Sequence, residues 1–104
     1  MELVEVCDIN FPEEGILKSV DVEGVELMIT LLKGKPIITT RSCTHKTYDL
    51  TKGHYTDGYV TCLLHTSTFD LESGDALNPP ASEALGVYSV IIKEGKYYID
   101  IDQN

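Results

Sequence analysis

Short stretches of alternating apolar and polar residues, separated by glycine-containing turns, are the feature that most limits how this chain can fold. Residues 25–32 read VELMITLL, with an aliphatic residue at nearly every second position, and this period of two is typical of a β-strand. Residues 16–22 are rich in β-branched and aliphatic residues, and Glu23-Gly24 predicts a tight turn between the two strands. A further strand is expected at residues 36–40.

The C-terminal part of the chain shows the clearest hairpin. Residues 87–93 and 96–102 flank a Glu94-Gly95 turn, which is the spacing of a two-residue hairpin loop. No window predicts a long amphipathic helix, and the best short candidate, residues 81–85, is about one turn long. We therefore predict an all-β fold, a small antiparallel β-sandwich or partly open barrel that forms a single domain over residues 1–104.

Charge and cysteine content exclude several functions. The 104 residues carry a formal net charge of -9, which argues against a nucleic-acid partner and against binding to an anionic membrane. The N-terminus is acidic, without the basic segment and apolar run of a signal peptide, and no stretch is apolar for the ~20 residues that a transmembrane helix needs. An odd number of cysteines (Cys7, Cys43 and Cys62) does not suggest a disulfide scaffold, so a cytoplasmic protein is expected.

Residues 41–68 differ from the rest of the chain. They are dominated by Thr, Lys, His, Tyr, Gly and Asp, a composition that we interpret as too polar for a packed sheet of its own. A polar segment of this length in a small domain is commonly functional. We expect something other than a hydrophobic core to order it.

The polar segment contains two pairs of metal-binding side chains. Cys43 and His45 form a C-x-H box, and after sixteen intervening residues Cys62 and His65 form a C-x2-H box. Two thiolates and two imidazoles make a four-ligand site that suits a two-iron cluster or a single zinc ion. The spacing alone leaves both possibilities open.

The residues around the two boxes resemble those of Rieske-type ferredoxins from about residue 42 to residue 81. Leu50 follows the first histidine by five residues, and Gly58 leads into the second box as the family's glycine does. Residues 69–74, FDLESG, are similar to the family's F-D-x-x-T-G, and residues 78–81, NPPA, are similar to its proline-containing loop.

The resemblance implies a [2Fe-2S] cluster, one per chain. Cys43 and Cys62 would bind one iron, and His45 and His65 the other. It also implies the Rieske fold, in which residues 41–68 form a nested cluster-binding subdomain at one end of the β-scaffold.

Departures from the family pattern indicate the subtype. Members of the cytochrome bc type carry an extra cysteine in each box, and Tyr48 and Leu64 stand at those positions, so that disulfide cannot form. Phe69 stands where those members have a tyrosine that hydrogen-bonds the cluster, whereas Ser67 matches their serine. Fewer hydrogen bonds to sulfur predict a lower-potential soluble member. Thr66 stands where most members have glycine, directly after the second histidine. Because glycine adopts dihedral angles that other residues rarely adopt, this departure leaves open which backbone conformation is found beside His65.

The function implied is one-electron transfer from a reductase to an acceptor such as an oxygenase. No catalytic constellation is visible, so we expect an electron carrier, a monomer with protein redox partners, rather than an enzyme. The alternatives are a zinc-stabilised or cluster-sensing regulatory module and an accessory subunit of a larger redox enzyme.

Residues 41–68 have a net charge of +1 and the remaining residues -10. The acidity therefore belongs to the scaffold, which predicts long-range attraction of a basic partner but a nearly neutral contact.

The remaining residues of interest have simpler interpretations. We expect His54 to be a solvated loop residue and Cys7 to be a small buried apolar residue. The resemblance implies that Leu50, Leu63 and Leu64 cover the cluster and limit the access of water; the alternative is that they are general core residues.

Overall fold

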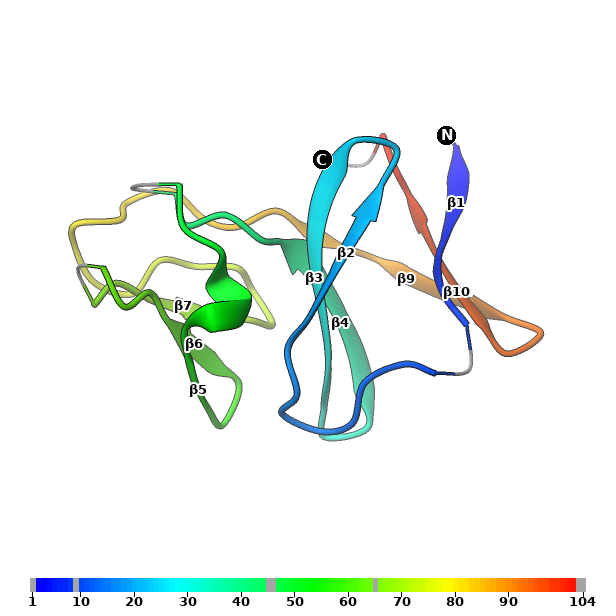
Figure 1. Cartoon of the computed structure of the whole chain (residues 1–104), viewed down its shortest axis with the longest axis horizontal. Coiled ribbons are helices and arrows are strands. Elements are labelled where there is room, and N and C mark those ends of the chain that lie inside the picture. Colours follow the sequence, from blue (N-terminus) through cyan, green and yellow to red (C-terminus); the bar gives the residue numbers. More distant parts are fainter. Residues whose placement is uncertain (1, 9, 45–46, 65, 103–104) are drawn as a thin grey trace.

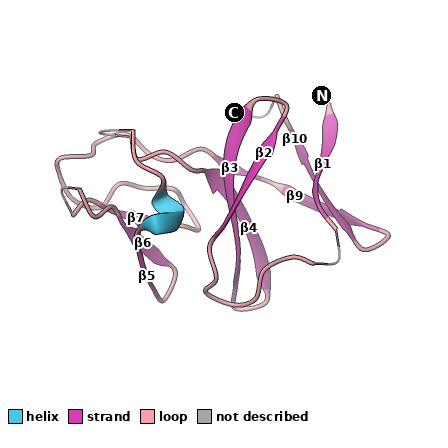
Figure 2. Ribbon diagram, in the orientation of Figure 1, coloured by secondary structure: helices cyan, strands magenta, loops and turns pink. Residues whose placement is uncertain are grey.

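A computed structural model describes residues 2–8, 10–44, 47–64 and 66–102. The elements in chain order are β1 (Leu3–Cys7), β2 (Lys18–Val22), β3 (Val25–Leu32), β4 (Lys35–Thr40), the 3-10 helix η1 (Leu50–Lys52), β5 (His54–Thr56), β6 (Tyr59–Thr61), β7 (Thr68–Asp70), β8 (Val87–Tyr88), β9 (Val90–Lys93) and β10 (Lys96–Asp100). The predicted all-β class is confirmed (Figures 1 and 2).

The strands form three antiparallel sheets that follow one another along the molecule (Figure 1). A three-stranded sheet has the order β1-β10-β9, a four-stranded sheet has the order β2-β3-β4-β8, and a second three-stranded sheet has the order β5-β6-β7. The four-stranded sheet lies in the middle, with β5, β6 and β7 on one side of it and β1, β9 and β10 on the other. We refer to the β5-β6-β7 sheet and its adjoining loops as the tip, and to the other two sheets as the body.

The predicted turns are two-residue hairpin loops. At the β2–β3 turn, Glu23 and Gly24 have φ angles of 52° and 80°, and at the β9–β10 turn, Glu94 and Gly95 have 53° and 77°. Two successive residues with positive φ define a type I′ turn, whose twist matches that of the flanking strands. These turns set the strand registers that the alternating sequence requires.

Pro36 explains why the predicted C-terminal hairpin is divided between two sheets. The backbone N–H of Thr40 donates to Gly86 at 2.9 Å, and Ile38 lies opposite Tyr88. In an antiparallel ladder the hydrogen-bonded positions recur at every second residue, so the next donor on β4 would be Pro36. Proline has no N–H to donate. The chain leaves β4 at this point, and Val90 pairs with β10 instead.

Two hydrophobic cores lie on the two faces of the central sheet. Leu27 and Ile29 of β3 face the core that is shared with the β1-β10-β9 sheet. Met28 and Leu32 of the same strand face the core that is shared with the tip. Because alternate residues of a strand point to opposite faces, residues 27–30 are all buried. The tip is thus packed directly onto the body.

The expectation that residues 41–68 are too polar for a sheet of their own is wrong. They supply η1, β5 and β6, and β6 pairs with β7. A few apolar side chains suffice, because Leu50, Val60 and Phe69 are fully buried in the core against the central sheet. The polar residues of the segment lie around this small core.

Helical structure is minor in the part of the chain that the structure describes. Residues 81–85 contain no helical turn, and Ala81 and Leu85 instead bury their side chains in the core of the tip. Within the described ranges, no helix has the length and apolar character needed to cross a membrane.

Candidate metal centre

The two cysteines of the predicted site begin two loops that are closed in the same way. The backbone N–H of Cys43 donates to the carbonyl oxygen of Tyr48 at 3.0 Å, and that of Cys62 donates to Ser67 at 2.8 Å. Each bond spans five residues and encloses one cysteine–histidine box. Both cysteines thereby occupy equivalent places at the base of their loops.

Both cysteine side chains are buried and belong to one core cluster. Cys43 is 5% exposed and Cys62 is 2% exposed, and they share this cluster with Leu50, Val60 and Phe69. Neither is in a disulfide bond. Two cysteine side chains, held in one core cluster and shielded from water, suit a soft metal centre. The predicted ligands His45 and His65 lie outside the described residues.

A third segment, residues 78–85, fastens the two loops together. The hydroxyl of Thr44, in the first loop, donates to the carbonyl oxygen of Glu83 at 2.7 Å. The backbone N–H of Ala81 donates to the Oγ of Ser67, in the second loop, at 3.0 Å. Ser67 is 1% exposed, so this serine fixes the loop from inside the protein.

Thr66 adopts the conformation that would normally require glycine. Its φ angle is +63°, in the left-handed region, which costs a residue with a side chain roughly 1–2 kcal/mol. Its N–H donates to the carbonyl oxygen of Cys62 at 2.9 Å, and its own carbonyl oxygen accepts a hydrogen bond from the side-chain amide of Asn78 at 3.0 Å. Threonine therefore preserves the backbone shape of this loop at the cost of strain.

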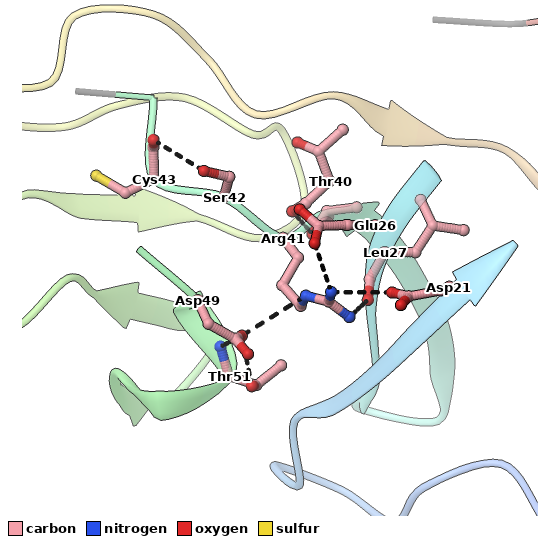
Figure 3. A network of polar contacts seen from close by, with 10 residues as sticks. Asp21, Glu26, Leu27, Thr40, Arg41, Ser42, Cys43, Asp49 and Thr51 are labelled. Atoms are coloured by element: carbon pink, nitrogen blue, oxygen red, sulfur yellow. Dashed lines mark hydrogen bonds and ion pairs between the residues drawn. The ribbon is translucent and has the colours of Figure 1, made fainter. Parts of the chain in front are cut away.

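Arg41 connects the first loop to the body (Figure 3). One guanidinium nitrogen lies 2.9 Å from a carboxylate oxygen of Asp21 and 3.2 Å from one of Glu26, both on the body. The Nε atom lies 3.7 Å from Asp49, at the start of η1. The side chain of Arg41 is only 11% exposed, so its charge is held between these carboxylates. Arg41 counts towards the net charge of +1 of residues 41–68, but its positive charge consequently does not lie on the surface of the tip.

Asp49 is the carboxylate of the tip that pairs with the Arg41 guanidinium. Partial burial by itself would raise its pKa, but hydrogen bonds from the side chain and backbone of Thr51 and the charges of Arg41 and Lys52 outweigh this and lower the pKa below its ordinary value. The Thr51 hydroxyl donates to Asp49 at 2.6 Å and its N–H at 3.0 Å. The ionised form of Asp49 is therefore stabilised by folding.

This lowered pKa predicts an acid dependence of stability. Because the unfolded carboxyl titrates near pH 3.9 and the folded one at a lower pH, the contribution of Asp49 is complete above about pH 5 and is lost as pH falls through the folded pKa. Urea denaturation between pH 3 and 6 measures the free energy of unfolding. It should be higher for the wild-type protein than for Asp49→Asn at pH 6, and this difference should shrink towards pH 3. Thr51→Val removes the hydroxyl that donates to Asp49, so its free energy of unfolding should depend less on pH over this range than that of the wild type. A wild-type advantage that is constant with pH would contradict this assignment.

The leucines near the site differ in exposure. Leu63 and Leu64 are 57% and 49% exposed, whereas Leu50 is fully buried in the core cluster that contains both cysteines. That these leucines cover the cluster stays a prediction. Leu77, which precedes the proline loop, is 52% exposed. The tip thus displays several large apolar side chains.

The other predicted residues fall outside the centre. His54 is exposed as expected, although it lies in β5 rather than in a loop, and it pairs with the Thr56 hydroxyl at 2.8 Å. Cys7 is half-buried rather than buried, at the end of β1 against the body core. Sequence reasoning missed Arg41 and Asn78. Their positions, immediately before the first box and before the two prolines, are the signal that could have found them.

Comparison with known proteins agrees with this arrangement. Residues 2–89 match the Rieske [2Fe-2S] domain family. The chain is 37% identical over 104 residues to the ferredoxin subunit of 3-phenylpropionate/cinnamic acid dioxygenase from Photorhabdus laumondii, covering 99% of this chain and 98% of the relative. It is 32% identical over 101 residues to the ferredoxin component of the Pseudomonas putida naphthalene 1,2-dioxygenase system, covering 97% and 94%.

Solved structures show the same fold. The Sphingomonas yanoikuyae B1 ferredoxin superposes with a TM-score of 0.87 at 26% identity, covering 95% of this chain and 98% of that one. A ferredoxin in complex with its oxygenase, from carbazole 1,9a-dioxygenase, superposes with a TM-score of 0.82 at 26% identity, covering 93% and 100%.

The donor set of the described loops fits a cluster of this kind, because it offers two buried cysteine side chains, neither in a disulfide bond, on matched loops. Together with the match over residues 2–89, this fold and site identify an iron–sulfur protein, and the chain belongs to the Rieske [2Fe-2S] domain family. Within that family it is of the ferredoxin type, an electron carrier that holds one Rieske cluster rather than a catalytic enzyme.

Proposed function

We propose that Cys43 and Cys62 bind one iron of the cluster and that His45 and His65 bind the other. The observation that carries this assignment is the matched closure of the two cysteine loops, with both thiols buried in one core cluster. Residues 41–68 then act as a cluster-binding subdomain nested within the single domain of residues 1–104. The cluster, when bound, supplies reversible transfer of one electron.

The chain then serves as the carrier between a reductase and an oxygenase of the kind that its relatives serve. The ferredoxin roles of those relatives in dioxygenase systems support this proposal. We further propose that it works in the cytoplasm, since none of its three cysteines is in a disulfide bond and a reducing compartment keeps thiols reduced.

The exposed leucines of the tip suit a protein partner. Leu63 and Leu64 lie within the second box and are largely exposed, and apolar side chains of this kind supply the buried centre of a protein interface. The charge of Arg41, where the tip joins the body, is neutralised by carboxylates of the body. The contact would therefore be apolar and close to neutral, while the acidic body attracts a basic partner from a distance.

Metal analysis of the purified protein tests the cofactor and its alternative. Two iron atoms and two acid-labile sulfides per chain, with visible absorbance, are expected for the proposed carrier. A colourless protein with one zinc ion per chain would instead support the zinc-stabilised module.

Replacing His65 with cysteine tests the ligand assignment. A thiolate brings a negative charge that a neutral imidazole lacks, so adding an electron to the cluster becomes harder. We expect the midpoint potential to fall by at least about 100 mV, the order of the difference between histidine- and cysteine-ligated clusters. His54→Cys is the matched control, because His54 is exposed in β5. Protein-film voltammetry that gives wild-type potential for His65→Cys would show that His65 is not a ligand.

A further inference from the structure

Asn78, the first residue of the proline loop, contacts the strained backbone that follows the second box. Its Nδ2 atom donates to the carbonyl oxygen of Thr66 at 3.0 Å, and its Oδ1 atom accepts from the backbone N–H of Thr68 at 2.7 Å. One side chain thus binds the backbone on both sides of Ser67. A side-chain amide suits this geometry, because it carries a donor and an acceptor on two different atoms of one planar group.

The backbone held by Asn78 is the one that needs support. Thr66 has φ +63°, and a β-branched residue leaves this conformation more readily than glycine would. If Thr66 relaxed, the chain would turn differently, and the bonds from Thr66 N–H to Cys62 and from Cys62 N–H to Ser67 could not both persist. Those two bonds define the loop that carries Cys62.

We propose that Asn78 is a positioning residue that holds Thr66 in the left-handed conformation and so keeps the second cluster loop in its ligating shape. The proposal rests on the proposed function, because it concerns the loop between two assigned ligands. On this proposal, Asn78 compensates for the threonine that stands in place of glycine at position 66. The two residues should therefore be energetically coupled, and Asn78 should matter less when residue 66 is glycine.

A double-mutant cycle of Asn78→Ala and Thr66→Gly tests this coupling. The first measurement is the half-life of the visible cluster absorbance at a fixed elevated temperature with an iron chelator present. We expect Asn78→Ala to shorten the half-life at least about threefold in the wild-type background, and by clearly less in the Thr66→Gly background. The second measurement is the midpoint potential, which Asn78→Ala should shift and Thr66→Gly should return towards wild type.

The potential separates positioning of the cluster loop from a general loss of stability. A residue that only stabilised the fold would change the half-life and leave the potential of the remaining intact protein unchanged. Asn10→Ala, an exposed asparagine of the body, is the matched control and should change neither quantity. If Asn78→Ala does not fold, Asn78→Asp replaces it in the half-life cycle, because it keeps the acceptor for Thr68 and loses the donor to Thr66.

The outcomes distinguish the inference from the function on which it rests. Equal effects of the Asn78 variant in both backgrounds, or an unchanged potential and half-life, would contradict the role of Asn78 while leaving the cluster assignment intact. Wild-type protein without iron and sulfide would contradict the proposed function, and with it any positioning of cluster ligands by Asn78.

Discussion

Cys62→Ser should yield a protein that has lost nearly all of its visible absorbance and iron. Cys62 is 2% exposed at the base of the second loop, and a serine hydroxyl is a much poorer ligand for iron than a thiolate. Cys43→Ser should have the same effect, because Cys43 occupies the equivalent place in the first loop. Iron and sulfide analysis together with the visible spectrum measure the loss.

Cys7→Ser is the matched control for this experiment. Cys7 is a free, half-buried cysteine at the end of β1 and packs against the body core rather than the core of the tip. It should keep the full cluster content. Equal cluster loss in Cys7→Ser and Cys62→Ser, or a full cluster in Cys62→Ser, would overturn the assignment of the thiolate ligands.

Phe69→Ala should cause the largest loss of stability of any single apolar truncation in the tip. Phe69 is fully buried, lies opposite Val60 in the β6–β7 ladder, and shares its core cluster with both site cysteines. Removing a buried phenyl ring from a packed core costs about 3–5 kcal/mol, which is a large part of the ~5–15 kcal/mol of a whole domain. The free energy of unfolding from urea titration measures it.

The chain supplies a second phenylalanine as a comparison. Phe11 is half-buried in the body and stacks on Tyr97 with ring centroids 4.3 Å apart. Phe11→Ala should therefore cost less, about 1–2 kcal/mol, and should leave the cluster content unchanged. A smaller loss for Phe69→Ala than for Phe11→Ala would mean that the core of the tip is not what stabilises the fold.

The ligand boxes could be found from sequence because their chemistry is local. A cysteine and a histidine within three or four residues form half of a metal site whatever the rest of the chain does, and the two halves here are recognisable by their flanking residues. The turn at Glu23-Gly24 is local in the same way, since its positive φ angles follow from the two residues themselves.

Features that depend on distant partners were missed or misjudged. The guanidinium of Arg41 reaches Asp21 and Asp49, which are 20 residues before it and 8 after it in the chain, and nothing in the local sequence selects those carboxylates. The exposure of Leu63 and Leu64 likewise depends on how the loops are held to residues 78–85, which is a matter of long-range hydrogen bonds.

The sequence by itself determined the β2–β3 and β9–β10 hairpins, their turns and the two cysteine–histidine boxes, because alternation, turn chemistry and ligand spacing act over a few residues. Only the tertiary structure decided that the polar segment has a sheet and a core. The reason lies in β3, where Met28 and Leu32 face the tip while Leu27 and Ile29 face the body. One strand thus lends an apolar face to a segment that has too few apolar residues to build a core alone, and a core shared in this way is invisible until the sheets are packed together.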